Sequence, residues 1–474
     1  MTPEHGSRSH SLAALLAPDI LDLLESDPSA IATETEELHP ADLADVAEAL
    51  PRGSLANFLH ALPHDRAAAV LEYLDEEIRT ELLEGMSTEQ SAQIVARMTP
   101  DERADVLDEV DEDVADDILE AIPEEMRRET EQLLEHEPDT AGGLMTTHVV
   151  SVLDSETVEA ALAQVRTIAR AGRREAMNVI YAVNANGSLS GVMSLRELLA
   201  APEGSRVHDV AWTDVRTVSV TADREEVARL TTEYDLVAVP VVDEQGRLLG
   251  MVTVDDVIDA IQEEQTEDVQ KLGGMEALDE PYMQISIGGM LKKRAGWLSI
   301  LMLSEMFTTS ALQHFDSELA KLPVLTLFIP LVMSSGGNSG SQATSLITRA
   351  MALKEVNLGD WWKVALRELP SGIILGAILG VLGVIRIIVW QNMGLYDYGR
   401  GGIPYYLVAN TVFFALVGIV TFGSLTGSML PFLLRRLGFD PASASAPFVA
   451  TLVDVTGLII YFTVALATLG HFIR

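Results

Sequence analysis

The sequence predicts a multidomain protein with an all-α superhelical N-terminal domain, an α/β domain of two repeated modules, and a five-span α-helical membrane domain. Three observations support this prediction. Most acidic residues lie before residue 291, two internal repeats fill that acidic part, and long apolar segments dominate the rest of the chain. A chain of 474 residues is long enough for several domains.

Charge separates the chain into two parts. The whole chain has 71 acidic and 32 basic residues, a formal net charge of −39. From residue 291 onward there are nine acidic and 13 basic residues, so this part carries about +4 and the preceding part about −43. So acidic a chain is not expected to bind nucleic acid, because a phosphate backbone requires clustered Lys and Arg. The absence of Cys excludes disulfides, thiolate metal sites and Cys nucleophiles.

A twelve-residue repeat predicts the N-terminal superhelix, which we place at residues 1–140. An apolar residue recurs every twelve positions from Leu38 to Leu134, and in all but the last unit another apolar residue follows eight positions later. Each unit is one short helix that cannot bury its apolar face alone, so the helices should stack. The exposed faces are acidic, which indicates either a solvated surface or one that attracts cations.

A second repeat predicts two α/β modules. Residues 189–198 (LSGVMSLREL) recur, after a shift of 59 residues, as residues 248–257 (LLGMVTVDDV). Each unit has alternating apolar residues, a turn, a second strand and a helix. This pattern resembles a pair of CBS modules, at residues 141–203 and 204–262. The resemblance implies a regulatory role, dimerisation and, in many such pairs, binding of adenine nucleotides.

An acidic helix is predicted to connect the second module to the membrane domain. Asp256, Asp259, Glu263 and Glu267 follow the spacing of one helix face. Like charges at this spacing weaken a helix unless a cation relieves their repulsion. We assign residues 263–290 to an acidic connecting (plug) helix and linker. The alternative is a solvated linker helix without a binding role.

Five segments after residue 291 have the length and apolar character of membrane spans. Basic residues in the linkers favour one side of these segments, nine against three. The positive-inside rule then predicts a cytoplasmic N-terminus, and five spans place the C-terminus outside. No secretory signal is recognised, so we expect a multi-pass protein of the cell inner (plasma) membrane. The predicted spans are residues 295–313, 322–343, 371–390, 405–434 and 447–472.

Two carboxylates lie inside the predicted spans, where ionisable side chains are costly and usually functional. Asp454 shares its helix face with Ala450 and Gly457. Small neighbours leave space for a hydrated ion, and Mg²⁺ is usually held by one or two carboxylates through retained water. The alternative is a protonated Asp454 bonded to a neighbouring helix. Glu305 could be protonated, or paired with a Ser or Thr.

Residues 334–342 (SSGGNSGSQ) are unusually polar and Gly-rich for a membrane span. Such a run is predicted to break the helix, and freed carbonyl groups at membrane depth can face a transported cation. Asn338 and Gln342 are therefore pore-lining candidates, together with Ala450, Gly457 and Glu305. Close helix packing through small residues is the alternative.

The order of these parts resembles the MgtE family of magnesium channels and transporters. Four stretches carry the resemblance: residues 336–342 (GGNSGSQ), 429–442 (MLPFLLRRLGFDPA), 450–457 (ATLVDVTG) and 264–273 (EQTEDVQKLG). The resemblance implies a homodimer in the lipid bilayer, with a pore domain at residues 291–474 and the pore on the two-fold axis. Asp454 of both chains would then face one hydrated Mg²⁺.

The resemblance also implies a sensor for cytoplasmic Mg²⁺. In the family, ions that bridge the acidic N-terminal domain, the CBS pair and the connecting helix hold the pore shut, and some members bind ATP at the CBS pair. Some members carry Asn where this chain has Ser341 and Ala446. The implied metal-binding positions are Asp223, Glu225, Asp235, Asp256, Asp259, Glu264, Glu267 and Asp268, with Asp101 and Asp105 as weaker matches.

Other functions stay open on the sequence alone. One is a transporter for another divalent cation, such as Co²⁺ or Ca²⁺, or for another solute, gated by a nucleotide at the CBS pair. Another is a membrane-anchored sensor that conducts nothing. An enzyme is not expected, because the chain has neither a GxxxxGK(S/T) phosphate loop nor an HExxH motif, and its ten His residues are scattered.

Overall fold

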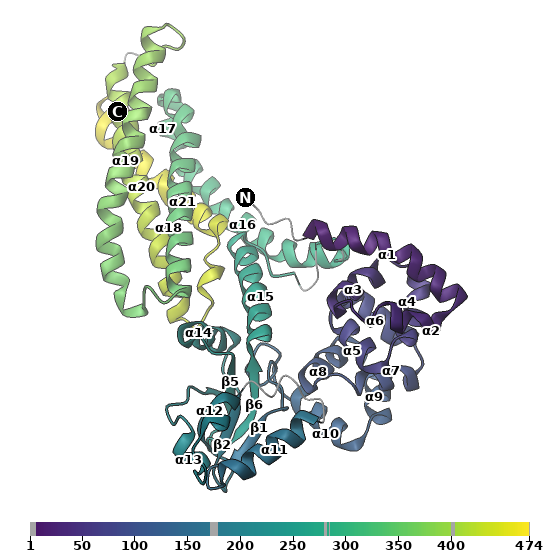
Figure 1. Cartoon of the computed structure of the whole chain (residues 1–474). Coiled ribbons are helices and arrows are strands. Elements are labelled where there is room, and N and C mark those ends of the chain that lie inside the picture. Colours follow the sequence, from purple (N-terminus) through teal and green to yellow (C-terminus); the bar gives the residue numbers. More distant parts are fainter. Residues whose placement is uncertain (1–5, 171–178, 279–281, 284, 400–402, 474) are drawn as a thin grey trace. The chain divides into compact units, whose positions relative to one another are not determined.

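The computed structural model describes residues 6–170, 179–278, 282–283, 285–399 and 403–473 (Figure 1). The chain divides into two compact units, Met1–Gln262 and Glu263–Arg474. The first unit contains a helical superhelix followed by two α/β modules, and the second contains long helices. The predicted order of a superhelix, an α/β pair and a helical C-terminal part is therefore confirmed.

Eight short helices that begin at intervals of twelve residues confirm the first repeat. Side chains at the helix starts explain some boundaries: Asp75 accepts a hydrogen bond from the backbone N of Glu77, and Ser87 forms a capping box with Gln90. The helices are α3 (Pro40–Glu48), α4 (Arg52–Ala61), α5 (His64–Glu72), α6 (Glu76–Gly85), α7 (Thr88–Val95), α8 (Pro100–Glu109), α9 (Glu112–Ala121) and α10 (Glu124–Leu134), preceded by α1 (Gly6–Ser26) and α2 (Pro28–Glu34).

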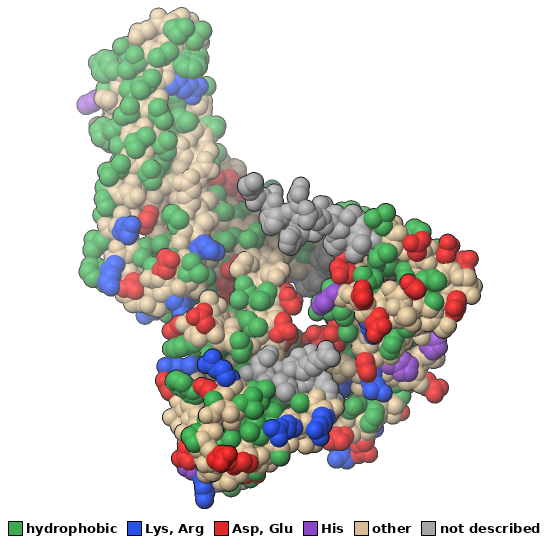
Figure 2. Space-filling view, in the orientation of Figure 1, with side chains coloured by type: hydrophobic (Ala, Val, Ile, Leu, Met, Phe, Trp, Pro, Cys, Tyr) green, Lys and Arg blue, Asp and Glu red, His purple; other side chains and the backbone are tan. Residues whose placement is uncertain are grey.

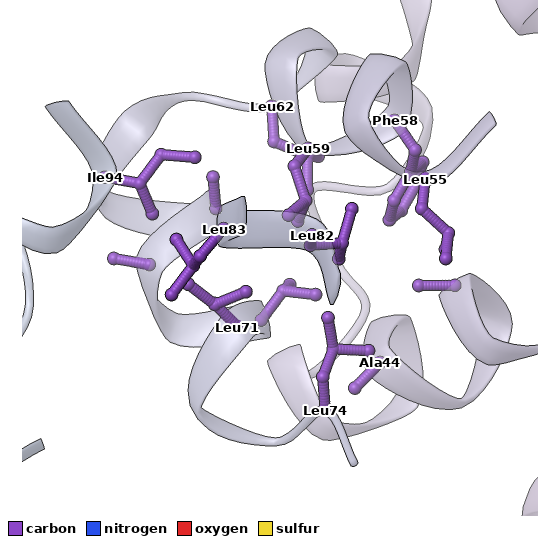
Figure 3. Packing of buried hydrophobic residues seen from close by; sticks show 14 of the residues in the cluster. Ala44, Leu55, Phe58, Leu59, Leu62, Leu71, Leu74, Leu82, Leu83 and Ile94 are labelled. Atoms are coloured by element: carbon purple, nitrogen blue, oxygen red, sulfur yellow. The ribbon is translucent and has the colours of Figure 1, made fainter. Parts of the chain in front are cut away.

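The apolar positions of the repeat form the core of the superhelix. Leu50, Leu62 and Leu74 are buried, as are Phe58 and Val70 eight positions after an anchor. Helices pack mainly on their second neighbours, α3 on α5, α5 on α7 and α7 on α9. Figure 3 shows leucines of α4, α5 and α6 meeting in this core. Each helix therefore buries its apolar face only by stacking, as the repeat predicts.

Each α/β module contains a three-stranded sheet. β1 (Val150–Leu153) is parallel to β2 (Ile180–Val183), which is antiparallel to β3 (Leu189–Met193). β4 (Val218–Ser219), β5 (Ala238–Val242) and β6 (Leu248–Thr253) repeat this order, and a register shift recurs at the equivalent position. The module helices are α11 (Val158–Arg170), α12 (Leu195–Ala200), α13 (Val207–Val210) and α14 (Arg224–Tyr234).

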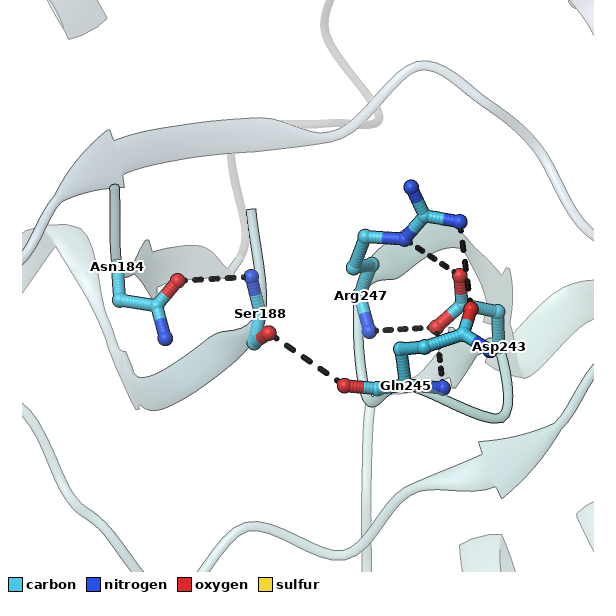
Figure 4. A network of polar contacts seen from close by, with 5 residues as sticks. All are labelled: Asn184, Ser188, Asp243, Gln245 and Arg247. Carbon is cyan, nitrogen blue, oxygen red and sulfur yellow. Dashed lines mark hydrogen bonds and ion pairs between the residues drawn. The ribbon is translucent and has the colours of Figure 1, made fainter. Parts of the chain in front are cut away.

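The hairpin turns of the two modules bond to each other. Gly187 and Gly246 have positive φ angles of 80° and 74°, which Gly adopts without a steric penalty. The side chains of Asn184 and Asp243 close the two turns by accepting backbone hydrogen bonds (Figure 4). Reciprocal bonds run from Leu189 N to Gly246 O at 2.9 Å and from Leu248 N to Gly187 O at 3.1 Å. The repeat thus pairs with itself inside one chain.

One helix, α15 (Val254–Leu272), begins in the first unit and ends in the second. Long helices make up the rest of the second unit, and Figure 2 shows apolar side chains over the visible face of these helices. The long helices are α16 (Ile287–His314), α18 (Ile329–Ala352), α19 (Trp361–Asn392), α20 (Tyr405–Arg436) and α21 (Ala446–Ile473), with short elements α17 (Asp316–Lys321), η2 (Pro323–Phe328), η3 (Leu358–Asp360) and η4 (Pro441–Ser443).

Within the described residues, three helical segments are long and apolar enough to cross a membrane: Leu358–Asn392, Tyr405–Arg436 and Ala446–His471. They correspond to the third, fourth and fifth predicted spans. The first predicted span forms most of α16, and the second forms η2 and much of α18. Polar side chains reduce the apolar character of α16 and α18. That all five segments cross a membrane stays a prediction.

The predicted helix break at residues 334–342 is wrong, because α18 continues through this run from Ile329 to Ala352. Its glycines bring helices together. A Cβ atom on Gly340 would lie 2.8 Å from the Val449 side chain of α21, and one on Gly427 of α20 would collide with the Gly340 carbonyl. Thr344 also donates to the Gly427 carbonyl at 2.9 Å. Close packing through small residues, the alternative, is what the structure shows.

We expect Gly427→Ala to destabilise the helical unit, because the added methyl group would collide with backbone that cannot rotate away. Overpacking of this kind costs about 1–3 kcal/mol. The thermal unfolding midpoint in detergent, followed by Trp fluorescence, should therefore fall. Gly470→Ala is the matched control, since a Cβ atom there meets nothing within 4 Å. An equal fall in both variants would contradict the packing argument.

Candidate functional site

Acidic side chains of α8 and of the start of α15 lie together in the first unit. Asp101, Glu102 and Asp105 lie near the start of α8, close enough for their charges to interact, and Asp256 interacts in the same way with Asp101 and Glu102. Asp101 is only 8% exposed, and its Oδ1 has no hydrogen-bond partner among the described residues. Asp256 is half-buried and accepts hydrogen bonds from Thr253 Oγ1 at 2.5 Å and Thr253 N at 3.3 Å. The structure thus brings together three residues that the sequence predicts separately.

Burial makes the ionised form of these carboxyls costly. It raises the pKa of Asp101, and with the added charge of Asp101 it raises the pKa of Asp256 to about 7. Glu102 was missed as a site residue. Burial, followed by the charges of Glu72, Asp101, Asp105 and Asp256, raises its pKa to about 9. The cluster is therefore favourable only when a proton or a cation compensates part of its charge.

Arginines of the superhelix are engaged by other carboxylates. Arg103 donates to Glu129 Oε2 at 3.0 Å and to Thr130 Oγ1 at 2.6 Å, and Arg79 donates to Glu109 Oε2 at 2.7 Å. In the described part of the chain, no Lys or Arg forms an ion pair with the acidic residues of the cluster. Nor do any three described His, Asp or Glu side chains form a group that could hold a metal ion directly.

Other predicted sensor residues of the first unit lie on exposed surfaces. Asp223 precedes α14 and accepts a hydrogen bond from the backbone N of Glu225 at 2.8 Å. Asp235 ends the same helix in the left-handed conformation, with a φ angle of 51°. Asp259 is exposed on α15. Helix capping accounts for the local structure at Asp223 and Asp235, so a metal-binding role for them stays a prediction.

The second unit contains a further acidic group at the end of α15. Glu264, Glu267 and Asp268 lie there, and Lys271 bonds to Glu267 and, at 2.8 Å, to Asp440 in the loop after α20. Burial, and then the charge of Asp440, raises the pKa of Asp268 to about 6. Burial alone would lower the pKa of Lys271, but its bonds to Asp440 and Glu267 raise it. Asp440 was not among the predicted site residues, although it joins this group.

Asp454 is half-buried on α21 and has no ion pair within the described residues. The small residues on its face contact neighbouring helices. A Cβ atom on Gly337 of α18 would lie 3.3 Å from that of Ala450, and one on Gly457 would lie 3.4 Å from Ile419 of α20. These two small residues therefore serve helix packing within the chain, and their role along a pore stays a prediction.

The remaining pore candidates lie on α18 and α16. Asn338 and Gln342 are exposed, and Glu305 is half-buried. Ser341 and Ala446, where some members of the resembled family carry Asn, contact each other: Ser341 Oγ donates to the Ala446 carbonyl at 3.2 Å. The two departures from the family pattern therefore lie at one contact between α18 and α21.

Three known families match successive parts of the chain. The divalent cation transporter family MgtE matches residues 329–464, which include Asp454. The MgtE intracellular N domain matches residues 38–139, which include Asp101 and Asp105. The CBS domain matches residues 207–263, which include Asp256.

Individual relatives agree with these matches. The magnesium transporter MgtE of Thermus thermophilus is 44% identical over 339 residues, 72% of each chain. That of Enterococcus faecalis is 34% identical over 348 residues, 73% of this chain and 72% of its own. A crystal structure of the cytosolic domain of the Mg²⁺ channel MgtE in complex with ATP is 38% identical, with a TM-score of 0.49, and covers 52% of this chain and 99% of that one. By the identity and coverage of the two transporters, the chain belongs to the MgtE family of magnesium transporters.

Proposed function

We propose that this protein is a Mg²⁺-selective channel or transporter that mediates Mg²⁺ uptake. The observation that carries this proposal is Asp454, a half-buried carboxylate on an apolar helix without an ion pair in the described residues. An ionised side chain at membrane depth is costly unless a cation accompanies it. The relatives from T. thermophilus and E. faecalis, which are named magnesium transporters, support Mg²⁺ as that cation.

A pore made by two chains follows from the width that a hydrated Mg²⁺ ion requires. Mg²⁺ gives up its water reluctantly, so a wide site with two Asp454 carboxylates suits the hydrated ion better than one. Paired CBS modules also give a self-complementary surface on which two copies can associate. We therefore propose a homodimer in the bilayer, with a cytoplasmic N-terminus and the C-terminus outside.

Closure by cytoplasmic Mg²⁺ is the regulatory part of the proposal. The cluster around Asp101 and Asp256 supports it, because buried carboxylates without ion pairs favour any state in which a cation lies between them. A site with a millimolar dissociation constant contributes about 4 kcal/mol. Several such sites acting on one compact state would close the pore over a narrow concentration range.

ATP at the CBS pair, and metal binding by Asp223, Glu225 and Asp235, remain proposals that rest on the family resemblance. In both proposals the ligand, ATP or a metal ion, would bind to the α/β modules and stabilise the same closed state of the pore. Transport of Co²⁺ or Ca²⁺ in place of Mg²⁺ is the alternative function, and the uptake experiment below distinguishes it.

Asp454→Asn should reduce Mg²⁺ uptake into proteoliposomes at least about tenfold, because removal of one charge from each chain weakens attraction for a divalent ion in a partly dry pore. Elution volume and thermal midpoint in detergent should not change. Asp360→Asn, the same substitution at the half-buried residue directly before α19, should retain uptake. Normal Mg²⁺ flux through the Asp454 variant would exclude this side chain from the ion path. Uptake of Co²⁺ or Ca²⁺ but not Mg²⁺ by the parent would favour the alternative function.

Without Mg²⁺, the contact between Asp101 and Asp256 should become more stable as the pH falls. A carboxyl with a higher pKa in the folded state binds its proton more tightly when folded. Above pH 7 the ionised carboxyl therefore destabilises the folded contact to its full extent. This destabilisation decreases as the pH falls from 7 to about 4. Hydrogen exchange of residues 100–110 in the full chain, corrected for intrinsic rates, should slow over this range.

Added Mg²⁺ at pH 8 should slow exchange in the same segment. Both effects should be smaller in Asp256→Asn, whereas Asp113→Asn, an exposed carboxyl on α9, should behave like the parent. If the exchange rate of this segment changes with neither pH nor Mg²⁺, the cluster is not part of the Mg²⁺ sensor.

Replacement of Glu264, Glu267 and Asp268 by Ala should leave a channel that conducts but no longer closes when Mg²⁺ is added on the cytoplasmic side. The reason is that Lys271 would keep its bond to Asp440, whereas the three carboxylates proposed to bind Mg²⁺ would be gone. Currents in excised patches measure this directly. The matched control replaces three exposed carboxylates of α9 with Ala: Asp113, Asp116 and Asp117. If the triple variant closes at the parent's Mg²⁺ concentration, this end of α15 is an ordinary solvated linker.

A further inference from the structure

Two aromatic contacts align α16 with α21. The ring centroids of Trp297 and Phe448 are 6.3 Å apart, and Phe315, directly after α16, stacks on Phe462 at 4.6 Å. Residue numbers increase together in these pairs, so the two helices run in parallel. Between the contacts the chain advances by about 27 Å along α16 and about 21 Å along α21, at 1.5 Å per residue.

This alignment places Glu305 level with Asp454. On α16 the two contacts are eighteen residues apart, and Glu305 lies eight residues after the first. On α21 they are fourteen residues apart, and Asp454 lies six residues after the first. Each carboxylate is therefore a little under halfway between the contacts. Glu305 is also close enough for its charge to act on Asp454. Neither carboxylate has an ion pair in the described part of the chain.

Rotation about the helix axes brings both carboxylates to the same flank. At about 100° per residue, Trp297 and Phe315 lie on one line along α16, and Glu305 lies about 80° to one side of it. Asp454 lies about 120° from Phe448 in the opposite sense of rotation. For two parallel helices that face each other, opposite senses of rotation lead to the same side of the pair. Both carboxylates therefore border one side of the contact between α16 and α21.

Thr308, one turn after Glu305, provides an independent sign of a ligand. It is 3% exposed, and its Oγ1 has no hydrogen-bond partner among the described residues. It lies near the line of Trp297 and Phe315, on the side of α16 that faces α21. Other hydroxyls of this helix, on Ser299 and Ser310, donate to the carbonyl four residues earlier. A buried hydroxyl without a partner is unfavourable, so Thr308 has an oxygen available to a ligand beside Glu305.

We propose that Glu305, Thr308 and Asp454 form a divalent cation site within one chain, on the path of transported Mg²⁺. The inference rests on the proposed function and adds a second carboxylate to it. Two carboxylates and one neutral oxygen are the hard oxygen ligands that Mg²⁺ takes, and water completes its shell. Glu305 adds a negative charge beside Asp454 in each chain, so it determines specificity by favouring divalent over monovalent cations.

Mg²⁺ uptake by the full chain in proteoliposomes, measured against Mg²⁺ concentration, tests this site. Glu305→Gln should raise the half-saturating concentration about tenfold, which corresponds to about 1.4 kcal/mol. Thr308→Val should raise it about threefold, and Thr308→Ser, which keeps the hydroxyl, should retain the parent value. Glu368→Gln, at a half-buried carboxyl on α19, is the matched control and should also retain it.

The outcomes separate this site from the proposed function. A parent protein that takes up no Mg²⁺ contradicts the function itself. If the parent transports, Asp454→Asn does not, and Glu305→Gln keeps the parent's half-saturating concentration, the function stands and the two-carboxylate site is overturned. Should Glu305→Gln fail to fold, Glu305→Asp keeps the charge on a shorter side chain. It should then shift the half-saturating concentration in the same direction by a smaller factor, and an unchanged value would equally overturn the site.

Discussion

Negative charge without matching positive charge is the constraint on which this protein depends. Burial makes ionised Asp101 and Asp256 costly, and Arg103 is bonded to Glu129 instead of to them. Asp454 repeats the situation on an apolar helix. A proton or a cation must compensate such groups, so their arrangement depends on the ions around the protein. This dependence is unusual for a structural core and is suited to a protein whose ligand is a cation.

A rigid frame of small residues holds the carboxylate on α21. Ser339 of α18 bonds to Ser424 of α20 at 2.8 Å, and glycines let α18 approach both α20 and α21. By contrast, Thr308 is the one buried side chain among the described residues of α16, whose Trp297 contacts Phe448 of α21. Backbone atoms in close contact cannot shift without a clash. Asp454 is therefore fixed from the side of α18 and α20, and α16 completes its surroundings.

Local patterns predicted the fold better than the site. The twelve-residue repeat and the shift of 59 residues could be recognised because each repeated unit buries its own face against the next. The helix break at residues 334–342 was wrong because Ser and Gly were judged by intrinsic propensity, whereas packing against α20 decides the outcome. Glu102 and Asp440 were missed for a related reason. Their importance depends on contacts with α15, far away in the sequence, and no local pattern encodes such contacts.

One continuous helix physically connects the two acidic groups. α15 begins with Asp256 beside Asp101 and ends with Lys271 bonded to Asp440. The helix between Asp256 and Lys271 is about 22 Å long, so the two acidic groups share one helix although they lie in different units. Asp440 lies in the short connection before α21, the helix of Asp454, so within the second unit one ion pair joins the end of α15 to the segment that leads into the apolar helix.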